Sequence, residues 1–393
     1  GAAVQVADEA GLEAALRRLL ADREEAAALG RRARASIQTH RGAAARNVEA
    51  MARLVEEHRP DVAVLVEAAP PADAPAGVVW RQGWAALLDL VRDPRVDVVL
   101  NALVGAAGLE PTLAALESGK RVALANKESL VCGGPLVREA ASRGGGELVP
   151  VDSEHSAIWQ CLTGRSAHGV RRVVLTASGG PFRNWTPEAL ASATVEQALQ
   201  HPTWRMGAKI TVDSATLVNK ALEVIEAHHL FGLPYEAIEV VVHPQSIVHS
   251  FVEFVDGAVL AQLGLPSMVG PILYALSYPE RWPHTAPVFD PVTVGALTFE
   301  PLRQECFPAF RLGVEAGRAG GGSPIVFNAA NEVAVTAFLE RRLRFVGIPA
   351  VLERVLARWT GPPPRSLEEV RAIDAWAREE AMRMIEQERS LWV

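Results

Sequence analysis

Residues 96–125 have the sequence VDVVLNALVGAAGLEPTLAALESGKRVALA, and this stretch decides the class of the fold. It predicts an apolar strand at Val96–Leu103, a glycine turn at Val104–Gly108, a helix at Pro111–Ser118 and a second strand at Arg121–Ala125. Continuous apolar strands that alternate with helices are typical of a parallel sheet with right-handed crossovers. The stretch therefore predicts a doubly wound α/β nucleotide-binding domain.

The alternation of strand and helix extends on both sides of this stretch. Upstream, the pattern predicts a helix at Val48–His58, a strand at Val62–Val66 and a helix at Trp84–Val91. Downstream, a strand is expected at Leu148–Val151. We therefore expect the nucleotide-binding domain to occupy residues 44–150.

From residue 151 onward the pattern changes. Short strands between long polar loops predict an α+β catalytic domain over residues 151–285. A proline-containing linker at 286–312 is expected to join it to a C-terminal helical domain at 313–393. Strands of the catalytic domain are expected at Val173–Thr176, Ala237–Val242 and Val259–Gly264. Helices of the C-terminal domain are expected at Asn328–Arg341, Ile348–Trp359 and Leu367–Glu386.

Composition and charge argue against several classes of protein. The formal net charge is −7, with 46 acidic residues against 39 basic ones, whereas nucleic-acid-binding proteins present a net basic surface. No apolar run reaches the roughly 18 residues of a membrane helix, and no signal peptide is recognisable at Gly1–Val6. The 3 cysteines lack the spacing of a zinc site or a disulfide framework. We therefore expect a cytoplasmic protein that binds neither nucleic acid nor a membrane.

A pair of carboxylates follows the strand at Leu148–Val151. In an extended chain the side chains of Asp152 and Glu154 would point to the same side, at the carboxyl end of the strand. Ligands bind at that edge of open α/β sheets. The alternative is a solvated strand end that caps the following helix.

A second group of polar residues lies on a predicted helix. Asn219 and Glu223 are four residues apart, and Lys220 and Glu223 are three apart, so all three share one face. The alternative is an ion pair on the protein surface, which would contribute little.

Small residues follow the predicted strand at Val173–Thr176. The segment Thr176–Arg183, TASGGPFR, can bring backbone N–H groups and a hydroxyl to a phosphate. An ordinary turn is the alternative. Three carboxylates without cysteine or clustered histidine favour Mg²⁺ or Mn²⁺ over zinc, and lysines such as Lys127 suit a phosphorylated substrate. The residues thus predict a metal-dependent enzyme that acts on a sugar phosphate, but not which reaction it catalyses.

Seven motifs occur in the order found in one enzyme family. They are Val104–Leu109, Ala125–Leu130, Pro150–His155, Thr176–Phe182, Val212–Lys220, His243–Ser250 and Phe327–Glu332. From about Arg46 to about Arg383, the chain closely resembles the 1-deoxy-D-xylulose-5-phosphate reductoisomerases.

The resemblance implies a fold, a reaction and a metal site. It implies an NADPH domain, a central catalytic domain and a C-terminal helical domain in a homodimer. The implied reaction converts 1-deoxy-D-xylulose 5-phosphate and NADPH to 2-C-methyl-D-erythritol 4-phosphate, a step of non-mevalonate isoprenoid biosynthesis. By analogy, Asp152, Glu154 and Glu223 hold the divalent metal, and Lys127 lies beside the reacting oxygens.

The resemblance also implies substrate contacts and a lid. The contacts carry over to Ser153, Ser178, His201, Ser214, Asn219 and Lys220. The flexible lid of the family matches His201–Gly207, in which Trp204 would close over the substrate and exclude water. The alternatives are that Trp204 is a packed surface aromatic and that His249 is a hydrogen-bonded core histidine.

The N-terminal segment departs from the family pattern. Members begin with a Gly-Ser-Thr-Gly-Ser-Ile-Gly turn that approaches the NADPH pyrophosphate, and residues 1–45 contain no such turn. Residues 1–43 instead resemble the C-terminal tail of a Kdo-transferase-type glycosyltransferase and are expected to be a foreign-looking helical segment. The Rossmann-like domain is therefore expected to be incomplete.

Part of the cofactor site carries over from the family. These residues are Ala45, Arg46, Asn47, Gly105, Asn126, Glu128 and Gly207. The alternative function is that of a defective homologue, which binds metal and phosphosugar but not NADPH. A third hypothesis gives residues 1–43 a glycosyl-transfer or docking role, but a segment of that length lacks donor and acceptor sites.

Overall fold

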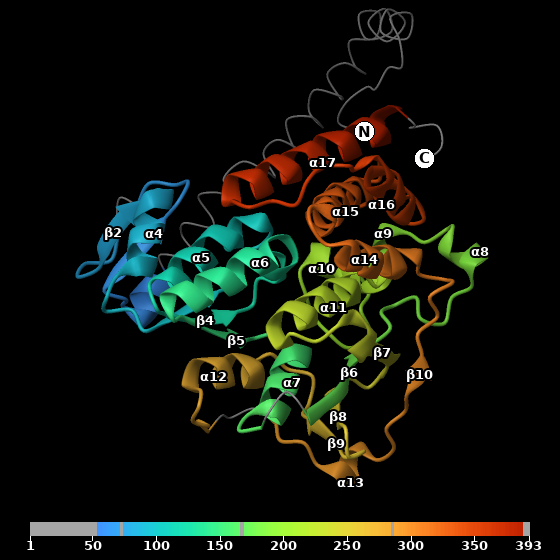
Figure 1. The fold of residues 1–393 in the computed structure, drawn as a ribbon, viewed down its shortest axis with the longest axis horizontal. Helices are drawn as coiled ribbons and strands as arrows, with labels where there is room; N and C mark the ends of the chain where they lie inside the picture. The colour runs from blue at the N-terminus through green and yellow to red at the C-terminus, as the bar shows by residue number, and fades with distance from the viewer. Residues whose placement is uncertain (1–52, 71–73, 166–168, 284–286, 388–393) are drawn as a thin grey trace, which may run out of the picture. The chain divides into compact units, whose positions relative to one another are not determined.

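The computed structural model describes residues 53–70, 74–165, 169–283 and 287–387 (Figure 1). The predictions for residues 1–43, and for Ala45, Arg46 and Asn47, lie outside the described residues. Of the helix expected at Val48–His58, residues 53–58 are described and are helical. The chain divides into two compact units, and the second begins at Val91.

The first unit contains a pair of parallel strands. β1 (Val62–Leu65) pairs with β2 (Val79–Gln82), with Val62 opposite Val79. Helix α4 (Trp84–Arg92) begins directly after β2 and crosses the boundary between the units in sequence. The strand and the helix expected here are confirmed. β2 was not predicted because it is short and only partly buried.

The second unit starts with the strand–helix–strand pattern of residues 96–125. β3 (Val98–Asn101), β4 (Arg121–Leu124) and β5 (Glu147–Pro150) form a parallel sheet in that order. Helix α5 (Leu109–Glu117) connects β3 to β4, and α6 (Lys127–Gly144) connects β4 to β5. Complete burial of residues such as Val122 and Val149 stabilises this sheet.

Helix α6 was missed because its interior contains Gly133, Gly134 and Pro135, which normally interrupt helices. Tertiary packing explains the two glycines. A Cβ on Gly133 would lie 2.5 Å from the Leu109 side chain, and one on Gly134 would lie 2.3 Å from the His229 ring. The helix is kinked at Gly133, where φ is −132° and ψ is 19°. Close packing of α6 against α5 and α11 explains why both positions are glycine.

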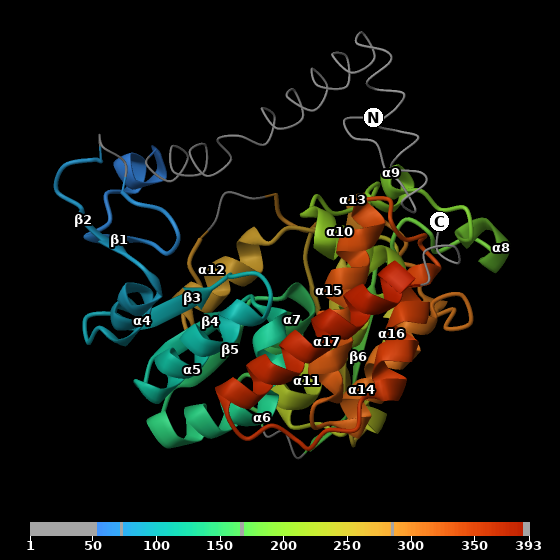
Figure 2. The ribbon, with the colours of Figure 1, turned by 90° about the horizontal axis from the view of Figure 1, so that it is seen from above.

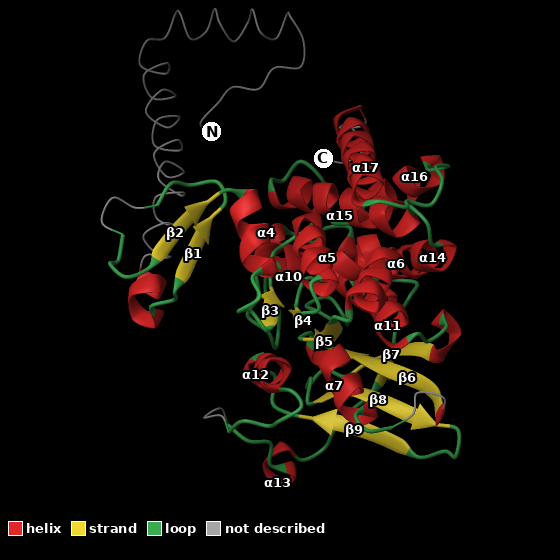
Figure 3. Ribbon diagram, turned by 60° about the vertical axis from the view of Figure 1, so that its left-hand side comes forward, coloured by secondary structure: helices red, strands yellow, loops and turns green. Residues whose placement is uncertain are grey.

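A five-stranded mixed sheet follows, in the order β10-β7-β6-β8-β9. Its strands are β6 (Val170–Ala177), β7 (Ile238–Val242), β8 (Val248–Phe254), β9 (Val259–Leu263) and β10 (Glu300–Pro301). Helix α7 (Ser153–Leu162) packs on β8 and β9, and α11 (Val218–Phe231) packs on β7. Figure 3 shows α11 between this sheet and the C-terminal helices.

The C-terminal helices pack around α15. Their bounds are α14 (Pro308–Ala319), α15 (Ser323–Leu339), α16 (Gly347–Arg358) and α17 (Leu367–Gln387). Figure 2 shows α15, α16 and α17 side by side, and α15 contacts each of the others. The three helices expected here are confirmed, and α14 begins within the segment expected to be a linker. None of the helices in the described part of the chain is long and apolar enough to cross a membrane.

Candidate active site

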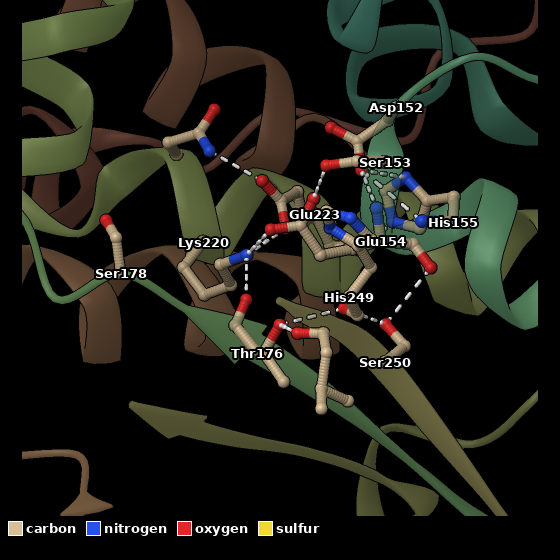
Figure 4. A network of polar contacts seen from close by, with 12 residues as sticks. Asp152, Ser153, Glu154, His155, Thr176, Ser178, Lys220, Glu223, His249 and Ser250 are labelled. Atoms are coloured by element: carbon tan, nitrogen blue, oxygen red, sulfur yellow. Dashed lines mark hydrogen bonds and ion pairs between the residues drawn. The ribbon is translucent and has the colours of Figure 1, made fainter. Parts of the chain in front are cut away.

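Three carboxylates converge where α7 meets α11. Asp152 is the N-cap of α7, and its Oδ1 accepts hydrogen bonds from the backbone N–H groups of Glu154 (3.1 Å) and His155 (3.3 Å). Oxygen atoms of Asp152, Glu154 and Glu223 lie within 4.8 Å of one another (Figure 4). The expectation that Asp152 and Glu154 converge along an extended strand is wrong, because the helix begins at Ser153. They converge because Asp152 caps α7 and Glu154 lies in the first turn of the same helix.

Lys220 joins two of these carboxylates to the sheet. Its Nζ lies 2.7 Å from Glu154 Oε1, pairs with Glu223 and donates a hydrogen bond of 2.5 Å to the Thr176 carbonyl. The predicted shared face of α11 is confirmed, since Asn219 Nδ2 also donates to Glu223 Oε1 at 2.5 Å. The side chain of Glu223 is 1% exposed, which excludes an ion pair on the surface.

Lys127, the first residue of α6, enters the cluster from the other side. Its Nζ forms an ion pair with Asp152 and lies 3.4 Å from Glu223 Oε1 and 3.5 Å from Glu226 Oε2. The sequence did not single out Glu226. Its i,i+3 spacing from Glu223 on the same helix is the signal that could have found it.

The charges of the cluster strongly influence one another. Burial, together with the negative charges of Asp152 and Glu154, raises the pKa of Glu223 to about 7. Burial would also raise the pKa of Asp152, but the nearby charges of Lys127, His155 and Lys220 outweigh it and lower that pKa. The three carboxylates are closely spaced, repel one another and offer only oxygen as a donor. They therefore fit a hard divalent cation such as Mg²⁺.

A cavity of about 250 Å³ opens beside the carboxylates. Its lining includes every metal, catalytic and substrate residue expected from the sequence: Lys127, Asp152, Ser153, Glu154, Ser178, His201, Trp204, Ser214, Asn219, Lys220 and Glu223. Met206, Ser246 and Met268 also line it and were not predicted. His249 lines the cavity as well and is buried, and burial lowers its pKa.

The turn after β6 is closely packed against helix α10 (Ala208–Thr216). Gly179 and Gly180 have φ values of 81° and 66°, which favour glycine. A Cβ on Gly180 would lie 2.7 Å from the Ser214 carbonyl oxygen. The turn therefore brings Ser178 and Ser214 to one side of the cavity, as a phosphate site requires.

His201 fixes the start of the loop that contains Trp204. Its Nδ1 accepts the backbone N–H groups of Thr203 (3.1 Å) and Trp204 (2.9 Å), and its Nε2 lies 2.9 Å from Ser178 Oγ. Burial lowers the pKa of His201, which favours the neutral ring. Because Nδ1 accepts two hydrogen bonds, the ring proton lies on Nε2, which donates a hydrogen bond to Ser178 Oγ. Trp204 is partly buried and lines the cavity.

Three of the residues expected to bind the cofactor, Gly105, Asn126 and Glu128, are linked by hydrogen bonds. Asn126 caps α6, and its Nδ2 donates to the carbonyls of Leu103 (2.8 Å) and Gly105 (3.0 Å) and to Glu128 Oε2 (2.9 Å). Gly105 has a φ of 76°, and Gly207 is the N-cap of α10. At the start of α6, Lys127 therefore lines the cavity, and Asn126 contacts the glycine turn at Gly105.

Comparison with known proteins identifies the family. Family models match residues 26–134 (1-deoxy-D-xylulose 5-phosphate reductoisomerase), 148–231 (1-deoxy-D-xylulose 5-phosphate reductoisomerase C-terminal domain) and 263–380 (DXP reductoisomerase C-terminal domain). The 1-deoxy-D-xylulose 5-phosphate reductoisomerase of Rhodococcus jostii is 54% identical over 346 residues, which are 87% of this chain and 86% of the relative. The chain belongs to the 1-deoxy-D-xylulose 5-phosphate reductoisomerase family.

Another member and two solved structures agree with this assignment. The reductoisomerase of Ralstonia pickettii is 52% identical over 346 residues, 85% of this chain and 87% of the relative. The Zymomonas mobilis reductoisomerase in complex with NADPH has a TM-score of 0.81 and 43% identity, covering 87% of this chain and 90% of that one. A DOX-P reductoisomerase in complex with NADPH, fosmidomycin and magnesium has a TM-score of 0.79 and 38% identity, with 86% and 89% coverage. The expected fold class, with its NADPH, catalytic and helical parts, is confirmed.

The reductoisomerase match reaches further toward the N-terminus than the motifs suggested. It begins at residue 26, whereas the motif resemblance begins at about Arg46. Residues 26–43 therefore fall within both the family match and the segment that resembles a glycosyltransferase tail.

Proposed function

We propose that this chain catalyses the NADPH- and metal-dependent rearrangement and reduction of 1-deoxy-D-xylulose 5-phosphate to 2-C-methyl-D-erythritol 4-phosphate. The observation that carries the proposal is the convergence of Asp152, Glu154 and Glu223 within 4.8 Å, at a cavity with serine, asparagine and lysine groups for a phosphate. Family membership, and the NADPH and magnesium in the complexes of two similar proteins, support the same reaction.

Asp152, Glu154 and Glu223 would hold the divalent metal. Their oxygen donors suit Mg²⁺ or Mn²⁺. A bound metal supplies Lewis-acid polarisation of the substrate carbonyl and hydroxyl oxygens. Lys127 lies beside Asp152 and Glu223, so its ammonium group would stabilise negative charge on a substrate oxygen there and could donate a proton to it.

The opposite side of the cavity would bind the phosphate. Ser178, Ser214, Asn219 and Lys220 present hydroxyl, amide and ammonium donors, and His201 orients the Ser178 hydroxyl through Nε2. The metal and phosphate sides share α11, because Asn219, Lys220 and Glu223 lie on one face of it. This arrangement fixes the substrate between them and, with Ser153, sets its orientation.

The loop at residues 201–207 would close over the bound substrate. Trp204 lines the cavity, and His201 anchors the loop through two backbone N–H groups. Closure would exclude water from the bound substrate.

The cofactor site would include Gly105, Asn126, Glu128 and Gly207, together with Ala45, Arg46 and Asn47. Gly105 has the left-handed backbone of a turn that approaches a ligand closely, which fits a dinucleotide. NADPH supplies the hydride when bound. Because Lys127 directly follows Asn126 at the start of α6, cofactor and substrate sites would meet at this helix end.

The domain division expected from the sequence remains part of the proposal. The proposal also includes a cytoplasmic homodimer that binds neither nucleic acid nor a membrane. Apolar side chains near an edge of the sheet support the dimer. β9 is an edge strand of the described sheet, and Trp282 and Val288 are 54% and 81% exposed. Sedimentation equilibrium tests the dimer, and a monomer at micromolar concentration would contradict it.

The first experiment is NADPH oxidation by the purified chain with 1-deoxy-D-xylulose 5-phosphate and Mg²⁺ or Mn²⁺, followed by nicotinamide absorbance. Oxidation that requires the substrate and is abolished by a chelator is the expected result. No oxidation, with metal and substrate still bound, would refute the proposal and favour a homologue that has lost NADPH binding. An NADPH titration then shows directly whether that loss has occurred.

A further inference from the structure

Lys127 and Lys220 each have one acceptor that is not among the three proposed metal ligands, Asp152, Glu154 and Glu223. Lys220 has the carbonyl of Thr176, which accepts its hydrogen bond at 2.5 Å. Lys127 has Glu226, whose Oε2 lies 3.5 Å from Nζ. Their other ion pairs in the described part of the chain are with Asp152, Glu154 and Glu223, whose oxygens a metal would take.

Glu226 is unusual because a glutamate is seldom buried in the protein interior. It is 3% exposed, and Lys127 is the only hydrogen-bonding or ion-pair partner of its carboxylate in the described part of the chain. It lies one turn after Glu223 on α11, yet it does not belong to the group of three carboxylates that converge. Burying a carboxylate is costly unless a charged partner compensates it, so apolar packing alone does not explain why Glu226 is buried beside Lys127.

Asp152 and Glu223, which pair with Lys127, are also two of the three residues that would hold a divalent metal. With a metal there, Lys127 would lose these acceptors in part, and like charge would repel its ammonium group. The cluster therefore contains four carboxylates, and Glu226 is the one that does not belong to the three converging groups.

We propose that Glu226 is a positioning residue, which holds the Lys127 ammonium group in the active site when a divalent metal takes the oxygens of Asp152 and Glu223. This inference rests on the proposed metal site. Lys220 needs no such residue because a backbone carbonyl of β6 already anchors it. The structure therefore assigns Glu226 a role that acts through Lys127 and not through the metal.

The direct test measures the position of Lys127. The wild-type protein and the Glu226→Gln variant are labelled with acetic anhydride, with and without Mn²⁺, and acetylation of Lys127 is measured by peptide mass spectrometry. We expect Mn²⁺ to leave labelling of Lys127 low in the wild type and to increase it several-fold in Glu226→Gln. Equal labelling in both proteins with Mn²⁺ bound would overturn the inference.

Kinetics separate positioning from a general structural role. Glu226→Gln should lower kcat about 10- to 100-fold, the usual effect of losing an outer-shell partner, with little change in KM for the substrate. Glu226→Asp keeps the charge and should recover part of the loss. In the Lys127→Gln background Glu226→Gln should have almost no further effect, because the residue it positions is gone. A loss in the double variant equal to the product of the single losses would overturn the inference.

Two further measurements serve as controls. Glu253→Gln removes the charge of another little-exposed glutamate, which pairs with Arg171 and Arg172 at 2.9 and 2.6 Å, and should leave kcat unchanged. Thermal unfolding of each variant shows whether it is folded, and Glu226→Ala replaces Glu226→Gln if the latter is not. Failure of the wild type to bind Mn²⁺ by electron paramagnetic resonance would overturn the metal site and the inference together. Binding by the wild type with no change in labelling would overturn the inference alone.

Discussion

The packing of the Ser-Gly-Gly turn against α10 makes a quantitative prediction for Gly180→Ala. Gly180 has a φ of 66°, a left-handed conformation that costs an alanine about 1–2 kcal/mol. In addition, the new Cβ would lie 2.7 Å from the Ser214 carbonyl oxygen, a backbone atom that cannot rotate away. The turn must therefore move away from α10, and Ser178 must move with it.

Displacing Ser178 should weaken substrate binding. A hydrogen bond to a charged group contributes about 1.5–3 kcal/mol, so losing the one to the phosphate should raise KM roughly 10- to 150-fold. Steady-state kinetics measure KM, and Mn²⁺ binding should be unchanged because the carboxylates lie on α7 and α11.

Gly232→Ala is the matched control for this substitution. Gly232 has a φ of 67°, but nothing lies within 4 Å of its Cβ position. This variant should lose similar stability through backbone strain and keep the wild-type KM. A normal KM for Gly180→Ala, or the same increase for Gly232→Ala, would refute the reasoning that contact with Ser214 fixes the phosphate side of the cavity.

Three other predictions concern the metal, the lid and stability. Glu223→Gln should weaken Mn²⁺ binding at least about 100-fold while the protein stays folded, and unchanged metal affinity in a titration would refute its role as a ligand. Trp204→Ala should lower kcat more than it weakens Mn²⁺ binding, and unchanged turnover would remove the lid assignment. Burial lowers the pKa of His229 to about 4, below the usual histidine value of about 6.5, so its contribution to stability is complete above pH 6.5 and is lost as the pH falls toward 4. By pH 5 the loss is about 2 kcal/mol, so His229→Gln should show a smaller drop in melting temperature between pH 7 and pH 5 than the wild type. An equal drop in both proteins would show that His229 does not cause it.

Two local predictions show where reasoning from sequence succeeds and where it fails. The shared face of Asn219, Lys220 and Glu223 was predicted correctly, because helical geometry fixes contacts three and four residues apart. The convergence of Asp152 and Glu154 was expected for the wrong reason, because the chain turns into α7 at Ser153. Both arrangements depend on the backbone conformation of a few residues. Only the convergence of Asp152 and Glu154 required knowing at which residue a helix starts.

The sequence by itself determined the order of the elements and the chemical types in the site. Apolar runs and glycine turns specify β3, α5 and β4, since strand and helix periodicity is a local property. Three acidic residues in recognisable motifs were enough to predict a site for a hard cation. No periodicity relates Lys127 to Glu223, or α6 to α11, because these contacts join residues far apart in the chain.

Only the tertiary structure decided which groups share the cavity and how their charges balance. It placed Lys127 between Asp152 and Glu226, and it buried Glu223 so deeply that its pKa rises to about 7. It also explained the glycines within α6 by the close approach of neighbouring helices. Burial and long-range contacts arise when separate elements pack together, so local sequence patterns cannot contain them.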